Sequence, residues 1–171
     1  MGADVNSVRK RLRRDAAHVA IEIPVPRQGE GQVIDRDLEE EVNLLSRSIG
    51  GLSVLSPEAT EALVERVSSQ FSVDRSRQWW WEGLLGARVI ECDTSDGLAA
   101  LQRLLPQNEA LALVVTDDEF PPWIAVSGAW PSLSRMLRET RLFEFFVVPD
   151  RLNWIVFSTH DSQLVVAGDL G

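Results

Sequence analysis

Only a few side chains in the sequence combine residue types and spacing that could support catalysis. His160 is followed by Asp161 at a predicted hairpin turn, and a histidine beside a carboxylate is a pair used in general acid–base catalysis. Catalytic triads are assembled in space rather than by adjacency, however, and no G-x-S-x-G sequence supplies an activated serine. Cys92, the only cysteine, is either a nucleophile beside a histidine or a small buried hydrophobe. Because these residues do not form a complete catalytic set in the sequence, we predict that the protein is not an enzyme.

Three adjacent carboxylates, Asp117, Asp118 and Glu119, lie before two prolines and between two predicted strands. Carboxylates bind divalent cations, but the D-x-D-x-D-G pattern of a calcium loop is missing from the sequence. Such a cluster is either a solvated turn or a contact for a basic partner. We therefore predict no metal site and no cofactor, and we assign the three carboxylates to partner binding.

Three consecutive tryptophans, Trp79, Trp80 and Trp81, form the most unusual local feature. On a strand they would send at least one side chain to each face, and on a loop they would expose much apolar area. Tryptophan is enriched at the hot spots of protein interfaces. Two of them could instead lie in the core, with the third at a helix end. We predict that one of the three contacts a partner.

The charge is distributed unevenly along the chain. Its formal net charge is −9, yet residues 1–14 sum to +4, so residues 15–171 carry −13. An acidic body repels phosphate and disfavours nucleic acid, whereas it would attract a basic protein partner. The same charge could also serve only solubility. The longest apolar run, Ala110 to Val115, is far shorter than the ~18 residues of a membrane span. We therefore expect a cytoplasmic protein without membrane contact, and the sequence leaves its oligomeric state open.

The positions of apolar residues and helix caps predict a helical N-terminal half. Apolar residues recur at helical spacing over residues 4–20, and again over 35–48. A third helix is predicted over 57–70, because Ser56 is a favourable N-cap and Pro57 suits the first helical position.

The C-terminal part changes to β-type sequence. The last three strands are separated by turn-like spacers and form a predicted meander, whose two faces are both mostly apolar and so require helical cover on at least one face. We predict one α+β domain over 1–171, mainly helical over 1–70, with the sheet in 77–171. Its sheet is expected to be mixed but mainly antiparallel, with about five or six strands and flanking helices. The predicted strands cover 87–92, 111–115, 123–126, 143–148, 154–159 and 164–167, and further helices cover 95–105 and 131–141.

About half of the chain resembles a small bacterial domain family found among predicted immunity proteins of polymorphic-toxin systems. The similar segments are RQWWWEGL (77–84), LALVVTDDEFPPWIAVSG (111–128) and LFEFFVVPDRLNWIVFSTHDSQLVVAGD (142–169). The last resembles the family's F-E-[YF]-[YF] strand, D-L-x-W turn and H-D turn, with one inserted residue in the D-L-x-W part and a single histidine. The resemblance implies a protein that masks a toxin by binding it, and it carries over no catalytic residues.

The sequence therefore predicts a non-catalytic, immunity-like module that binds and masks a partner protein, such as a basic toxin or effector. Two alternatives remain. The first is a small hydrolase or nuclease that uses His160, Asp161 and nearby carboxylates. The second is an adaptor or structural subunit for a secreted effector, with the basic N-terminal helix as its point of attachment.

Overall fold

The computed structural model describes residues 36–74, 79–92, 97–116, 123–140 and 144–170. The chain divides into two units, Met1–Gly31 and Gln32–Gly171, and all described residues belong to the second. The helix predicted over 4–20 and its basic residues lie outside the described residues, so that part of the prediction is not tested.

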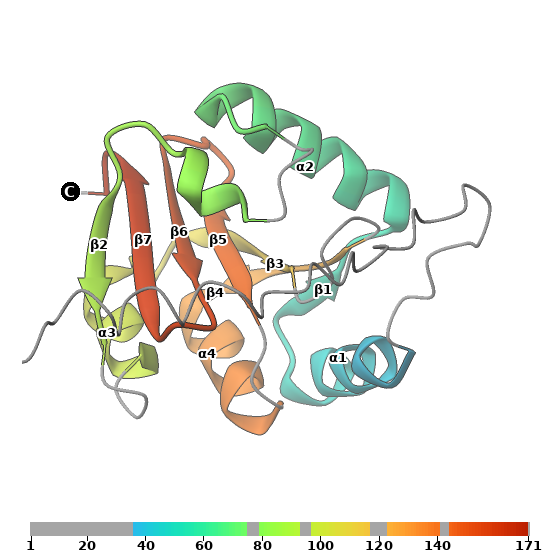
Figure 1. The fold of residues 1–171 in the computed structure, drawn as a ribbon. Coiled ribbons are helices and arrows are strands. Elements are labelled where there is room, and N and C mark those ends of the chain that lie inside the picture. The colour runs from blue at the N-terminus through green and yellow to red at the C-terminus, as the bar shows by residue number, and fades with distance from the viewer. Residues whose placement is uncertain (1–35, 75–78, 93–96, 117–122, 141–143, 171) are drawn as a thin grey trace, which may run out of the picture. The chain divides into compact units, whose positions relative to one another are not determined.

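The α+β class is confirmed (Figure 1), and the six strands and four helices predicted after residue 34 are all present with small shifts at their ends. A short strand that was not predicted, β1, adds a seventh. The elements in chain order are α1 (Arg36–Ile49), β1 (Leu52–Val54), α2 (Pro57–Phe71), the 3-10 helix η1 (Trp80–Gly83), β2 (Arg88–Glu91), α3 (Gly97–Leu104), β3 (Ala110–Val115), β4 (Ile124–Ala129), α4 (Trp130–Glu139), β5 (Phe145–Pro149), β6 (Trp154–Ser158) and β7 (Gln163–Gly168).

The seven strands form one sheet in the order β1-β4-β3-β5-β6-β7-β2. Every neighbouring pair in it is antiparallel, so the described sheet is antiparallel throughout rather than mixed. The predicted meander is formed by β5, β6 and β7, which follow one another in the sheet. Strands β1 and β2 lie at its two edges.

The start of α2 follows from its sequence. Ser56 has an extended backbone, and its hydroxyl oxygen accepts a hydrogen bond from the Ala59 backbone N–H at 3.2 Å. Pro57 occupies the first turn, where its missing N–H costs nothing. The predicted N-cap is thus confirmed, and it fixes where α2 begins over the sheet.

Each face of the sheet carries its own apolar core, which explains why the meander strands are apolar on both sides. Helices α1, α3 and α4 cover one face, where Leu38, Leu101 and Trp130 pack on strand residues such as Val147. Helix α2 and η1 cover the other face, where Val64 and Trp80 pack on Phe146 and Ile155. Figure 1 shows these two layers on opposite sides of the sheet.

The antiparallel register brings distant residues to one end of the sheet. Phe145 at the start of β5 pairs with Ser158 at the end of β6, and Gln163 at the start of β7 pairs with Glu91 at the end of β2. The residue before β5 and the turn between β6 and β7 must therefore lie close together, although about sixteen positions separate them in the chain.

Candidate functional site

The three tryptophans occupy three different environments. Trp80 is 2% exposed, and its ring centroid lies 4.9 Å from that of Trp123 and 6.1 Å from that of Phe146. Trp81 is partly buried, with its ring 5.8 Å from Phe157. Trp79 is 38% exposed. Trp79 has an extended backbone just before η1, and a 3-10 helix turns by about 120° per residue, which separates Trp80 from Trp81. Of the three predicted contact residues, Trp79 is the most exposed and the one that a partner can reach, and Trp80 is a core residue.

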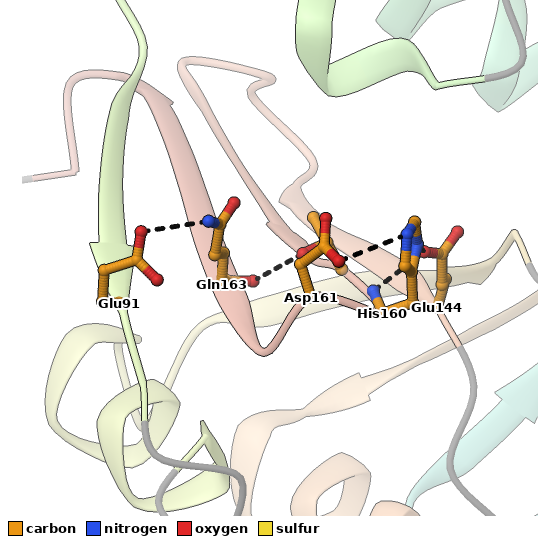
Figure 2. A network of polar contacts seen from close by, with 6 residues as sticks. Glu91, Glu144, His160, Asp161 and Gln163 are labelled. Atoms are coloured by element: carbon orange, nitrogen blue, oxygen red, sulfur yellow. Dashed lines mark hydrogen bonds and ion pairs between the residues drawn. The ribbon is translucent and has the colours of Figure 1, made fainter. Parts of the chain in front are cut away.

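The imidazole of His160 lies between two carboxylates, as Figure 2 shows. Its Nδ1 contacts Oε1 of Glu144, and the same oxygen accepts a hydrogen bond from the His160 backbone N–H at 2.8 Å. On the opposite side of the ring, Nε2 lies 3.5 Å from Oδ1 of Asp161. The adjacent His160-Asp161 pair of the sequence is thus joined by a third residue, Glu144, which the sequence did not single out.

The hydrogen bond with Glu144 raises the pKa of His160 above its ordinary value, because a carboxylate stabilises the imidazolium. Burial acts in the opposite direction, while the negative charges of Glu144 and Asp161 also raise the pKa. The charged form of the ring is therefore favoured in this setting.

Two tryptophans flank the same imidazole. The ring centroid of Trp79 lies 6.0 Å from that of His160, and the centroid of Trp81 lies 6.2 Å from it. A cation at this distance from an indole is attracted to the ring's electrons. The open Trp79 ring and the His160 cluster thus form one surface rather than two.

Polar side chains continue from His160 along the end of the sheet. The Gln163 amide donates to Oε1 of Glu91 at 3.0 Å. Figure 2 shows Glu91, Gln163, Asp161, His160 and Glu144 side by side across the ends of β2, β7, β6 and β5. We call these five residues the acidic row, since three are carboxylates and one is a histidine between two of them.

Most of the exposed large apolar residues of the described chain lie in one segment, which leads into β2. The described chain has four exposed large hydrophobic residues, and three of them fall within the segment that contains η1 and the start of β2. They are Trp79 at 38%, Leu85 at 86% and Val89 at 54% exposure, whereas the fourth, Leu44 at 68%, lies on α1. Val89 pairs with Val165, which belongs to the core on the α2 side, so its side chain points to the face that η1 covers. We call Trp79, Leu85 and Val89 the apolar strip.

The remaining candidates for catalysis or metal binding are Cys92 and the three carboxylates of residues 117–119. Cys92 is half buried and packs against the core on the α1 side, with its Sγ 3.7 Å from the Ile90 carbonyl oxygen. Among the described residues, no group of three histidine, cysteine or carboxylate side chains is placed to hold a metal ion. Asp117, Asp118 and Glu119 lie outside the described residues, and their predicted role is not tested. Thr116, the last described residue before them, donates its backbone N–H to the Glu144 carbonyl at 2.8 Å.

Sequence reasoning missed Glu144, Leu85 and Val89. Glu144 could have been found from the meander, since a hairpin of β5 and β6 places the residue before one strand beside the residue after the other. Leu85 and Val89 gave no such signal, because apolar residues at the start of a strand are normally expected to be buried.

In comparisons with protein-family models, curated proteins and solved structures, no match to the chain was found. None of the helices in the described part of the chain is long and apolar enough to cross a membrane.

Proposed function

We propose that this protein is a non-catalytic binding module that masks a basic partner protein, as an immunity protein masks a toxin, and that it acts in the cytoplasm. One observation carries the proposal, namely that the exposed Trp79 lies against His160 of the acidic row. Singly exposed apolar residues are ordinary on a protein surface, but an exposed tryptophan next to charged groups is typical of protein interfaces.

The two parts of this surface suit two stages of binding. The net charge of −9 attracts a basic partner over a distance of about a Debye length, and the acidic row then orients it. Burial of the Trp79 ring supplies affinity, because tryptophan is the side chain most often found at interface hot spots. The second layer of the proposal, an immunity role, is supported by the resemblance of residues 77–169 described above.

The test uses the tagged full-length protein as bait in lysate of its own host, at low and moderate salt. Each basic protein that is recovered in stoichiometric amount is then purified. Its affinity is measured for the purified wild type and for Trp79→Ala. We expect Trp79→Ala to weaken binding by roughly thirtyfold, the effect of a hot-spot residue. Leu44→Ala is the matched control, because Leu44 is exposed but lies on α1 away from the strip.

Equal effects of Trp79→Ala and Leu44→Ala would contradict the placement of the interface. Failure to recover any stoichiometric protein at either salt concentration would contradict the binding function itself.

A second candidate, a small hydrolase, is favoured by the contact of His160 with Glu144. A carboxylate on Nδ1 is the arrangement that orients a histidine for proton transfer. Two features weigh against it. The second ring nitrogen lies 3.5 Å from the Asp161 carboxylate, and the raised pKa of His160 favours the charged imidazolium, which cannot accept a proton. A screen of ester and phosphodiester substrates, with His160→Gln as control, tests this candidate, and turnover that disappears in the variant would support it.

A further inference from the structure

At the edge of the described sheet, β2 has backbone groups that point away from the sheet. Strand β2 ends the seven-stranded sheet, and within the described part of the chain β7 is the strand that pairs with it. The Cys92 backbone N–H donates to the Ser162 carbonyl at 3.0 Å, just beyond the pair of Glu91 with Gln163. Hydrogen bonds in an antiparallel pair alternate along each strand, so Arg88, Ile90 and Cys92 direct their backbone groups toward β7. Val89 and Glu91 therefore direct their N–H and carbonyl groups away from the sheet.

The two edges of the sheet differ in how they are protected. Strand β1 has three residues, and Ser53 is its exposed one. Strand β2 has four residues and exposes the charged Arg88 and Glu91, but it also exposes Val89, an apolar β-branched residue, at 54%. Natural edge strands are usually kept short, polar or covered, because an apolar edge invites another strand. An edge that exposes valine is therefore suited to binding.

We propose that β2 binds an extended, basic segment of the partner protein, which adds to the sheet as an antiparallel strand. This inference rests on the proposed binding function and specifies the surface and the kind of partner. Residues directly opposite each other in an antiparallel pair lie on the same face. The added strand would thus place an apolar side chain opposite Val89 and a lysine or arginine opposite Glu91.

The charge pattern around β2 favours a cation at that position. Glu91 is the first member of the acidic row, and Gln163 next to it leads to Asp161, so a cation opposite Glu91 lies at the start of a series of carboxylates. On the other face of β2, Arg88 would lie opposite an acidic or polar residue, and Ile90 opposite an apolar one. Read from its N-terminus, the preferred partner segment has the order basic, apolar, apolar, acidic, with further basic residues before it.

The same geometry argues against a second copy of this chain as the occupant. Antiparallel pairing at one edge keeps corresponding faces of the two sheets on the same side, so an even-numbered residue always lies opposite an even-numbered one. Arg88 and Glu91 of two copies therefore cannot lie opposite each other, and their charges cannot pair. Two bodies that each carry a net charge of −9 also repel each other.

The first experiment uses blocked synthetic peptides with the central sequence Lys-Ile-Val-Glu, preceded by further lysines. In the proposed register, the valine lies opposite Val89 and exchanges hydrogen bonds with it, while the isoleucine directs its N–H outward. N-methylation of the valine should therefore weaken binding by at least about tenfold, through loss of a hydrogen bond and a steric block. N-methylation of the isoleucine is the matched control, and it should change the affinity of the peptide by less than about twofold.

Binding is measured by NMR titration of the full-length protein with millimolar peptide, together with amide hydrogen exchange. We expect slowed exchange at the Val89 and Glu91 amides, and no binding by a peptide in which glutamates replace the lysines. Equal effects of the two N-methyl groups, or no response at these two amides, would overturn the inference. Protection of the two amides that grows with protein concentration in the absence of peptide would also overturn it, in favour of a second copy.

The second experiment separates this inference from the proposed function. Val89→Pro removes an outward N–H without touching the bonds to β7, and Val89→Lys and Val89→Glu keep that N–H while carrying opposite charges. With the partner recovered as above, we expect Val89→Pro and Val89→Lys to lose at least about tenfold in affinity, and Val89→Glu to lose less than Val89→Lys. Circular dichroism checks that each variant is folded. If all three variants bind the partner as the wild type does, the β2 edge is not the contact, while the binding function stands.

Discussion

The contact of Glu144 with His160 makes a quantitative prediction about stability and pH. The substitution Glu144→Gln removes the carboxylate charge and keeps an oxygen that accepts the His160 backbone N–H. In the folded wild type, the hydrogen bond with Glu144 raises the pKa of His160 above its ordinary value of 6.5. The imidazolium therefore stabilises the fold. This contribution is complete below the ordinary pKa, and it is lost as the pH rises through the folded-state pKa.

The size of the effect is limited by solvent. The His160 side chain is 53% exposed, whereas that of Glu144 is 15% exposed, so water screens the pair from one side. Ion pairs at exposed sites contribute about 0.2–1 kcal/mol, and we expect about 0.5 kcal/mol here. The Glu144 carboxylate also accepts the His160 backbone N–H, so a single variant would not isolate the pair.

A double-mutant cycle with Glu144→Gln and His160→Gln isolates the interaction, because other losses cancel. Urea unfolding at about pH 5 should give a coupling of about 0.5 kcal/mol, which should fall toward zero at about pH 9. NMR titration of the His160 ring should give a lower pKa in Glu144→Gln than in the wild type. A coupling that is constant or larger at high pH, or an unchanged His160 pKa, would refute the assignment of the pair.

Three further predictions concern the core, the end of β7 and the partner. Trp80→Ala should lower the free energy of unfolding by about 3–5 kcal/mol in urea titrations, because the Trp80 ring is buried. Trp79→Ala should lower it by less than about 1 kcal/mol, because Trp79 is 38% exposed. Gly168→Ala should lower the free energy of unfolding by more than about 2 kcal/mol, since the φ of Gly168 is +87° and a Cβ there would lie 2.3 Å from the Asn153 carbonyl oxygen. Gly97→Ala is the matched control, because Gly97 has open space around it, and it should change the free energy of unfolding by less than about 1 kcal/mol. Replacing the carboxylates of residues 117–119 by lysine should slow association with the recovered partner in stopped-flow measurements and weaken its salt dependence, and an unchanged on-rate would contradict their predicted role.

Local signals predicted the elements of the fold well. Ser56 and Pro57 set the start of α2, and the apolar, β-branched runs predicted the meander. Strand β1 was missed because three residues between Gly51 and Leu55 are too few to show a period. The antiparallel pairing of β3 with both β4 and β5 is a long-range choice, which no local pattern encodes.

The candidate site was predicted in part, for a similar reason. His160 and the tryptophans stood out by residue type alone. Their assembly with Glu144 depends on the register of β5 with β6, and the burial of Trp80 depends on where η1 lies over the sheet. Burial of a given tryptophan cannot be read from a run of three identical residues, because Trp79 precedes η1 with an extended backbone while Trp80 and Trp81 lie within this helix of four residues.

The acidic row and the β2 edge are parts of the same hydrogen-bonded sheet, and this bears on how a partner would bind. Glu91 belongs to both, and its position is fixed by pairing with Gln163 in β7 and by the side-chain hydrogen bond between the two. A surface held in this way loses little conformational freedom when a partner docks, so more of the contact energy remains as affinity. The cost of ordering then falls mainly on the partner's extended segment. A partner segment that is already held as a strand should therefore bind more tightly than the same sequence as a free peptide.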